Sequence, residues 1–338
     1  MAKRTSRRAP KIQPSVMTFY IPTAPISAGS PVTQYLDLSQ VASLMNRRFY
    51  RQGINWAVSG IKVLSQSGYV GSVAVSKLPN TWIMSNAWEK SFRTWQKMNQ
   101  EALSETESVR PKFMDFKIYA DEDHHAAGFA ANLLPIAQGG AYTPGEWEPS
   151  KVMIPLATPA DPTATADREL IAVGGNYPGA GASGLNAVSV IEGYAASRGL
   201  PNVLDPNVPA DSENASGNVP TNWMAAIFNE GTDQTTDILD VLIDENNIAP
   251  YPFENDGVHT DTMYPGGANQ GSGLMIHDVE FISPTTIGGT TRLKGGNFPC
   301  GLIRFDMTND GETSNLILQV DLVPGDHRGY LCEPMTEM

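Results

Sequence analysis

The sequence predicts an all-β fold, namely an eight-stranded jelly-roll β-sandwich with inserted short helices and long loops. Several short segments alternate apolar and polar residues, which is the period of a half-buried strand. Glycine (31 residues) and proline (25 residues) are frequent, which favours turns and short strands. The strand-like segments do not alternate regularly with helices, which disfavours a doubly wound α/β sheet.

Charge divides the 338-residue chain into two parts. Residues 1–36 contain five basic residues and no acidic residue, whereas the rest contains 18 basic and 36 acidic residues. The first eleven residues lack a periodic apolar face, and the four prolines from Pro14 to Pro31 favour an extended chain. We expect residues 1–33 to form a disordered basic arm and a proline-rich strap, and residues 34–338 to form the jelly-roll domain with its loop insertions.

The elements after the arm are expected to begin with a short helix or turn over residues 36–45, with Ser39 as its N-cap. Apolar and polar residues then alternate over residues 54–63 and over residues 69–75. The segment 66–68 between them has turn composition, so the two strands are predicted to form a β-hairpin.

Residues 81–104 change to a helical period. Four apolar side chains lie on one face of this predicted helix: Trp88, Phe92, Trp95 and Leu103. The stripe is expected to pack against a sheet. The alternative is a platform on which nucleobases stack, because Lys90, Arg93 and Lys97 lie on the same helix.

Shorter elements fill the rest of the chain. Helices are predicted at residues 185–198 and 236–245, and residues 223–228 fit either a strand or a short helix. Further strands are predicted at residues 113–120, 152–157, 169–173, 274–282, 302–307 and 316–323. The last strand leads into a Pro-Gly turn.

One glycine pattern matches a dinucleotide-binding fingerprint. Gly179, Gly181 and Gly184 follow a predicted strand and precede a predicted helix, which is the context that the fingerprint requires. Residues 174–178 separate the strand from the first glycine, and no repeated βαβ unit surrounds the pattern. A flexible loop is therefore the preferred interpretation, and a phosphate-binding turn is the alternative.

Two acidic segments have a metal site as their alternative interpretation. His124 and His125 follow three acidic residues, and a solvated turn is preferred there. Asp237, Asp240 and Asp244 share one face of a predicted helix, and a solvated face is preferred there. The alternative for the second segment is a calcium site between subunits, because clustered carboxylates suit oxygen-preferring cations.

Chemistry-bearing motifs are otherwise lacking. Cys300 and Cys332 are too few for a disulfide framework or a four-cysteine zinc site, and two reduced thiols are preferred over one disulfide. The sequence contains no nucleophile elbow, Walker loop or His-Glu-x-x-His motif. We predict no enzyme activity, catalytic residue, metal ligand or cofactor. No apolar run is long enough to insert into a membrane.

The basic arm is the strongest candidate for a binding site. Cations without neighbouring acids contact phosphates and release counterions without reading base sequence. A second basic cluster follows the first predicted helix. The predicted nucleic-acid-binding residues are Lys3, Arg4, Arg7, Arg8, Lys11, Arg47, Arg48 and Arg51. The alternative role of the arm is a nuclear localisation signal or a solubilising tail.

These features resemble the capsid proteins of small icosahedral viruses, in particular those of circular single-stranded DNA viruses. The resemblance rests on the arm Lys3–Lys11, the proline-rich segment Pro14–Pro31, the β-rich body and the final strand and turn at 318–326. It implies a self-assembling icosahedral shell around a viral genome, single-stranded DNA rather than RNA. It also implies a protein found in the virion and assembled in the host cell, in the nucleus. A host receptor would contact exposed loops: 139–150, 174–185 and 255–273.

Two other classes of function remain as alternatives. A sandwich-type carbohydrate-binding or surface-binding module explains the long glycine-rich and proline-rich loops but leaves the basic arm unexplained. A nucleotide-dependent enzyme would use the Gly179–Gly184 loop.

Overall fold

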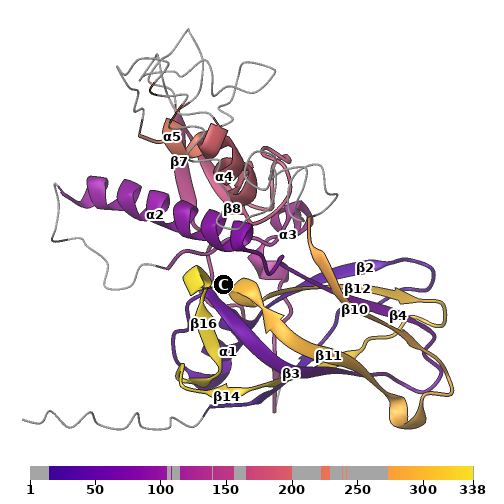
Figure 1. Ribbon diagram of the computed structural model, residues 1–338. Coiled ribbons are helices and arrows are strands. Elements are labelled where there is room, and N and C mark those ends of the chain that lie inside the picture. Colours follow the sequence, from indigo (N-terminus) through magenta and orange to yellow (C-terminus); the bar gives the residue numbers. More distant parts are fainter. Residues whose placement is uncertain are drawn as a thin grey trace, which may run out of the picture.

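Figure 1 shows the computed structural model, which describes residues 15–104, 108, 115–138, 140–155, 165–199, 222–228, 238, 241 and 273–337. The fold is mostly β, as predicted, and its two large sheets are antiparallel. These sheets form a β-sandwich. The described residues between β4 and β10 form a second part, here called the insertion, which lies at one end of the sandwich (Figure 1).

The two large antiparallel sheets contain five and four strands. The first sheet has the order β1 (Thr18–Pro22), β13 (Ile317–Leu322), β3 (Ile54–Leu64), β11 (Thr290–Phe298), and the short β16 (Cys332–Pro334) also pairs with β3. The second sheet has the order β10 (Met275–Ile282), β4 (Gly71–Lys77), β12 (Leu302–Asn309), β2 (Val32–Asp37).

One hydrophobic core lies between the two sheets. Alternate residues of each strand point into it, as on β12, where Ile303, Phe305 and Met307 are fully buried. Leu318 and Val320 of β13 enter the same core from the other sheet. The apolar residues whose two-residue period predicts these strands are therefore the residues that fill the core.

Two predictions about the sandwich are wrong. The strands expected to form a hairpin lie in different sheets, β3 in the first and β4 in the second, so the chain between them passes from one sheet to the other. Alternation of apolar and polar residues does not distinguish a hairpin within one sheet from two strands in facing sheets, because in both cases each strand turns one face to the core. The expected boundary after residue 33 is also wrong, because β1 and the start of β2 already belong to the sandwich.

Helix α1 (Leu38–Asn46) follows β2 directly. Asp37 is its N-cap, since its Oδ1 accepts the backbone N–H of Ser39 at 2.8 Å and of Gln40 at 3.3 Å. The predicted cap at Ser39 is therefore wrong. The Ser39 hydroxyl instead donates to the Arg51 carbonyl oxygen at 3.1 Å and accepts the Trp56 indole N–H at 3.2 Å.

The insertion contains both helices and strands. Its main elements are α2 (Trp82–Ser104), α3 (Glu122–Ala127), β7 (Lys151–Pro155), β8 (Thr165–Ile171), β9 (Ala187–Ser189), α4 (Val190–Gly199) and α5 (Trp223–Ala226). β7, β8 and β9 form one sheet, in which β9 pairs parallel to β8. α2 lies across the end of the sandwich, and its aromatic stripe enters a second core shared with this sheet (Figure 1).

Several short elements complete the described chain: η2 (Phe129–Ala131), β5 (Ile136–Ala137), β6 (Gly140–Ala141), η4 (Ile287–Gly289), η5 (Pro299–Gly301), β14 (Pro324–Gly325), β15 (Gly329–Tyr330) and η6 (Met335–Glu337). The helix predicted at 185–198 is split, since its first residues form β9. The helix predicted at 236–245 lies largely outside the described residues.

Arg304 on β12 fixes the insertion to the outer face of the second sheet. Its guanidinium Nη1 donates to Asp121 at 2.7 Å and to Asp123 at 2.9 Å, and its Nε donates to Asp306 at 3.0 Å. Asp121 also accepts the Tyr35 hydroxyl at 2.6 Å. The Asp121 side chain is only 1% exposed, so its charge depends on the ion pair with Arg304, whose side chain is 16% exposed.

We predict that Arg304→Leu destabilises the protein by about 3–5 kcal/mol, because the buried Asp121 carboxylate loses its ion pair. Urea denaturation followed by tryptophan fluorescence measures this change. The control is Arg292→Leu, which removes an exposed guanidinium from β11 and should change stability by at most about 0.5 kcal/mol. Equal effects of the two substitutions would contradict the docking role of Arg304.

Candidate nucleic-acid interface

The eight predicted nucleic-acid-binding residues fall into two groups. Lys3, Arg4, Arg7, Arg8 and Lys11 lie outside the described residues. Arg47, Arg48 and Arg51 lie in the turn that joins α1 to β3. The structure therefore locates the second cluster and the point at which the arm joins the fold.

The turn after α1 orients the arginines outward. Arg47 ends the helix in the left-handed region, with φ of 53°. The Tyr50 backbone N–H then donates to the Ser43 hydroxyl at 2.9 Å, and the Tyr50 ring is buried in the sandwich core. Because Tyr50 points inward, the flanking Arg47 and Arg51 remain exposed, and Arg48 is half-buried.

The first described residues lie beside this turn. Val16 donates its backbone N–H to Asn46 at 2.9 Å, and Arg48 donates to the Ser15 hydroxyl at 3.4 Å. The Ser15 hydroxyl donates to the carbonyl oxygen of Arg328 at 2.8 Å. The five cations of residues 1–11 are therefore tethered at a site that already holds Arg48 and Arg328.

Arg328 is a functional candidate that sequence reasoning missed. It lies in the turn between β14 and β15, is exposed, and donates to the Phe49 carbonyl oxygen. Its backbone is in the left-handed region, with φ of 51°. No sequence signal links it to Arg48, because the two residues are distant in the chain and meet only through the strand pairing.

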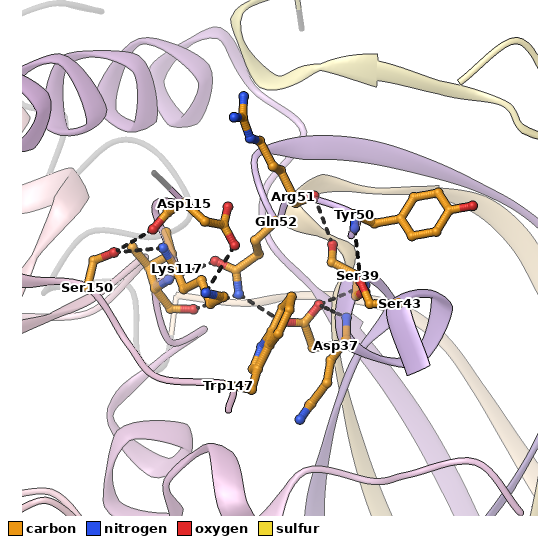
Figure 2. A network of polar contacts seen from close by, with 12 residues as sticks. Asp37, Ser39, Ser43, Tyr50, Arg51, Gln52, Asp115, Lys117, Trp147 and Ser150 are labelled. Carbon is orange, nitrogen blue, oxygen red and sulfur yellow. Dashed lines mark hydrogen bonds and ion pairs between the residues drawn. The ribbon is translucent and has the colours of Figure 1, made fainter. Parts of the chain in front are cut away.

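A buried polar network supports this basic turn from behind (Figure 2). Oδ2 of Asp37 accepts the side-chain amide of Gln52 at 3.1 Å and the Trp147 indole N–H at 3.0 Å. Burial raises the pKa of Asp37 to about 6, although its four hydrogen bonds favour the charged form. Trp147 comes from the loop 139–150, the loop expected to face a receptor, and this one side chain reaches the network.

Gln52 ties the basic turn to the insertion. Its amide donates to the Ile118 carbonyl oxygen at 3.1 Å and accepts the Ile118 N–H at 2.7 Å, as a paired strand would. Nearby, Lys117 forms an ion pair with Asp115 at 3.1 Å. Figure 2 shows that the Arg51 side chain extends away from this network. Gln52 therefore holds the insertion while its neighbour Arg51 faces outward.

A cleft of about 570 Å³ opens between this turn and α2. Its lining combines guanidinium groups, namely Arg51, Arg93 and Arg328, with aromatic rings, namely Phe49, Trp88, Phe92, Phe116 and His327. Two acids, Glu89 and Asp115, also line it, and each is paired with a cation, Arg93 and Lys117 respectively. The cleft is thus both aromatic and net positive, on a body that is acidic.

The aromatic stripe of α2 contributes to both the core and the cleft. Trp88 and Trp95 are buried, which confirms the predicted core packing. Phe92 is half-buried and stacks on Trp88 with ring centroids 5.2 Å apart. Phe116 packs against both Trp88 and Phe92. The stripe therefore presents the edge of a packed aromatic cluster to the cleft.

The glycine-rich segment does not form the context of a dinucleotide site. It leads into strand β9 and not directly into a helix. The Ala182 N–H donates to the His125 carbonyl oxygen at 3.2 Å, and a Cβ added at Gly181 would lie 2.5 Å from the His125 ring. Gly181 is therefore needed for close packing on α3, which accounts for a glycine at this position.

The histidine pair is not a solvated turn, because both side chains are buried in α3. His124 accepts the Ala120 N–H through Nδ1 at 3.0 Å, and its Nε2 lies 2.8 Å from the Asn132 side-chain oxygen. Burial lowers the pKa of His124 to about 3, so the ring is neutral. Nε2 of His125 lies 2.9 Å from Glu169, which is also buried. The acidic residues before the pair provide the cap and ion pairs of α3.

Other candidate sites have the following outcomes. Asp237, Asp240 and Asp244 lie outside the described residues, and within the described part of the chain no group of three or more histidine, cysteine or acidic side chains is arranged to hold a metal. Cys300 and Cys332 are free thiols, the first fully buried and the second half-buried. No helix in the described ranges is long and apolar enough to cross a membrane.

Comparison with known proteins gives no match to a protein family, to a curated protein or to a solved structure. The functional argument therefore depends on the strand arrangement and on the chemistry of the basic, aromatic end of the molecule.

Asp37 is predicted to make stability fall as the pH rises from about 4 to about 6. The folded protein holds this proton up to a pKa of about 6, whereas an unfolded aspartate releases it near about pH 3.9. The folded state binds more protons in this window, so the free energy of unfolding decreases with pH and then levels off. A pKa raised this far corresponds to at most about 3 kcal/mol.

The measurement is urea denaturation of the wild type and of Asp37→Asn at pH 4, 5, 6 and 7, since the variant lacks the titrating group. The difference in unfolding free energy between the two proteins should change between about pH 4 and 6 and stay constant above. Asp326→Asn, at an exposed carboxyl, is the matched control. A difference independent of pH would show that Asp37 does not titrate as described.

Proposed function

We propose that this chain is a viral capsid protein that assembles into an icosahedral shell and packages nucleic acid through its basic N-terminal arm. The observation that carries the proposal is the pairing order of the eight sandwich strands. The separation of charge along the chain and one exposed apolar edge strand support it.

The pairing order supports the jelly-roll part of the proposal. Numbered along the chain, strand one pairs with eight, two with seven, three with six and four with five; in order the strands are β1, β2, β3, β4, β10, β11, β12 and β13. The pairs β13–β3 and β12–β4 join these ribbons into two sheets. A long antiparallel ribbon rolled into two sheets gives this order, which viral capsid domains and lectins use.

The basic end of the molecule favours a capsid over a lectin-like binding module. Five arm cations join the fold at Ser15, beside Arg48 and Arg328, and Arg47 and Arg51 are exposed on the same turn. The rest of the chain carries twice as many acidic as basic residues. Such a distribution concentrates a polyanion at one end of each subunit while the acidic body repels it.

Strand β10 supplies a surface for self-association. It is the terminal strand of the second sheet and exposes four apolar side chains: Met275, Ile276, Val279 and Phe281. Ile276 is 70% exposed and Phe281 is 79% exposed. The two acids of the strand do not cover these side chains, because Asp278 is buried and paired with Lys294 and Glu280 is half-buried. An edge strand that exposes apolar side chains promotes pairing with another chain. We assign this edge to contacts between copies of the subunit.

The arm is predicted to supply most of the non-specific affinity for nucleic acid. Replacing Lys3, Arg4, Arg7, Arg8 and Lys11 by glutamine should abolish nucleic-acid co-purification and lower the salt slope of binding by about 4, because each lost phosphate contact contributes about 0.7–0.9. Absorbance ratios and salt-dependent titration of a labelled oligonucleotide measure both effects.

The control for the arm variant is the double substitution Lys151→Gln with Arg292→Gln, which removes two exposed cations from the body. It should leave binding unchanged. Negative-stain microscopy of the unaltered protein tests the shell itself, and closed particles of uniform size are expected. A monomer that stays stable at high concentration and free of nucleic acid would refute the capsid proposal.

Phe281→Lys is predicted to reduce particle formation strongly while leaving the fold intact, since a charge on an edge strand opposes pairing with another chain. Particle yield by sedimentation and the thermal midpoint of the monomer measure the two effects. Tyr20→Lys, at the half-exposed edge strand β1, is the matched control and should assemble normally. Normal assembly of the Phe281 variant would exclude β10 from subunit contacts.

A further inference from the structure

We propose that the cleft between α2 and the α1–β3 turn binds an unpaired nucleobase together with its phosphate, so that the protein selects single-stranded over duplex nucleic acid. This inference takes its ligand class from the proposed function. It adds a second binding element, distinct from the arm, and a basis for choosing between two forms of nucleic acid.

Aromatic rings in the cleft suit a base. Phe92 and His327 are half-buried at its surface, and Trp88 and Phe116 lie behind Phe92 in a packed cluster. A ring held by such packing loses little conformational entropy when a base stacks on it. Stacking on an aromatic side chain depends on the flat face that every base offers, so it does not require a particular sequence.

Guanidinium groups line both walls of the cleft and can bind the phosphate of the nucleotide. Arg93 projects from α2, whereas Arg51 and Arg328 come from the sandwich side. Arg93 is paired with Glu89, and Asp115 is paired with Lys117 and also interacts electrostatically with Arg51. The three arginines still outnumber the two acids of the lining, so the cleft keeps a net positive charge for a phosphate. Guanidinium groups bind phosphate oxygens with paired N–H donors and also stack on bases.

The size of the cleft favours single-stranded over duplex nucleic acid. Its volume of about 570 Å³ lies within the range of about 300–1,000 Å³ found for small-ligand pockets. A base inside a duplex is already stacked and paired, so it enters such a pocket only after extrusion, which costs a few kcal/mol. An unpaired base enters without most of this cost, and the cleft therefore favours single strands.

The arm and the cleft have complementary roles. Arg328 belongs to both, because its carbonyl oxygen accepts from Ser15 at the arm junction and its side chain lines the cleft. Residues 1–14 contain no aromatic residue, so the arm offers cations but no ring on which a base can stack. Any stacking preference for bases over a bare phosphate backbone must then come from residues outside the arm.

The test measures affinities of the full-length protein for three probes of about 12 nucleotides, a length within the usual site size: oligothymidine, an abasic chain of equal length, and a duplex. Oligothymidine should bind about 5- to 150-fold more tightly than the abasic chain for each stacked base. Phe92→Leu, which keeps an apolar side chain but removes the flat ring, should abolish this preference and leave abasic binding unchanged.

Two substitutions at exposed positions complete the design. Arg51→Gln should weaken oligothymidine and abasic binding alike, and Arg292→Gln, on β11, should change neither. Equal affinity of the unaltered protein for oligothymidine and the abasic chain overturns the inference, whether or not the Phe92 variant folds. An equal loss for both probes in a folded Phe92→Leu variant also overturns it.

This outcome is separable from that of the proposed function. Closed particles that contain nucleic acid, combined with no preference for bases, would refute the cleft and leave the capsid proposal standing. A base preference in a protein that forms no particles would support the cleft and refute the capsid.

Discussion

The fold depends on strand pairing between the two ends of the sequence. Every strand pair within the two large sheets joins a strand from residues 18–77 to one from residues 275–334. The entropy of closing so long a loop grows only slowly with its length, so an insertion of this size is tolerated. Lys77 and Met275 are register partners, and the insertion therefore leaves and re-enters the sandwich at neighbouring positions.

Because the insertion leaves and re-enters the sandwich at neighbouring positions, it lies at one end of the sandwich. Buried polar contacts then hold the insertion against the sandwich. Arg304 binds Asp121, Gln52 pairs with the backbone of Ile118, and Asp37 accepts the indole of Trp147. Each contact joins a sandwich residue to an insertion residue. A buried charge or amide left without its partner is costly, so these contacts favour one arrangement of the two parts over alternatives.

Local patterns predicted the core strands well, because alternation of apolar and polar residues indicates a strand with one buried face. They did not predict which strands pair, since β3 and β4 face the same core from opposite sheets. Short-range rules also missed the buried state of His124, which depends on Tyr35, a distant residue stacked on its ring with centroids 4.3 Å apart. Arg328 was missed for the same reason. The cleft is made of segments that only the tertiary fold brings together.

The cleft lies at the junction of the two parts, and this location links ligand binding to the docked arrangement. Arg51 and Gln52 are adjacent, so the chain that faces the cleft is also the chain that holds Ile118. One wall belongs to α2 and the other to the sandwich. A ligand that contacts both walls binds the docked form and not a form with the insertion displaced. Such a ligand therefore stabilises the docked form by mass action, at the end of the molecule where the arm joins the fold.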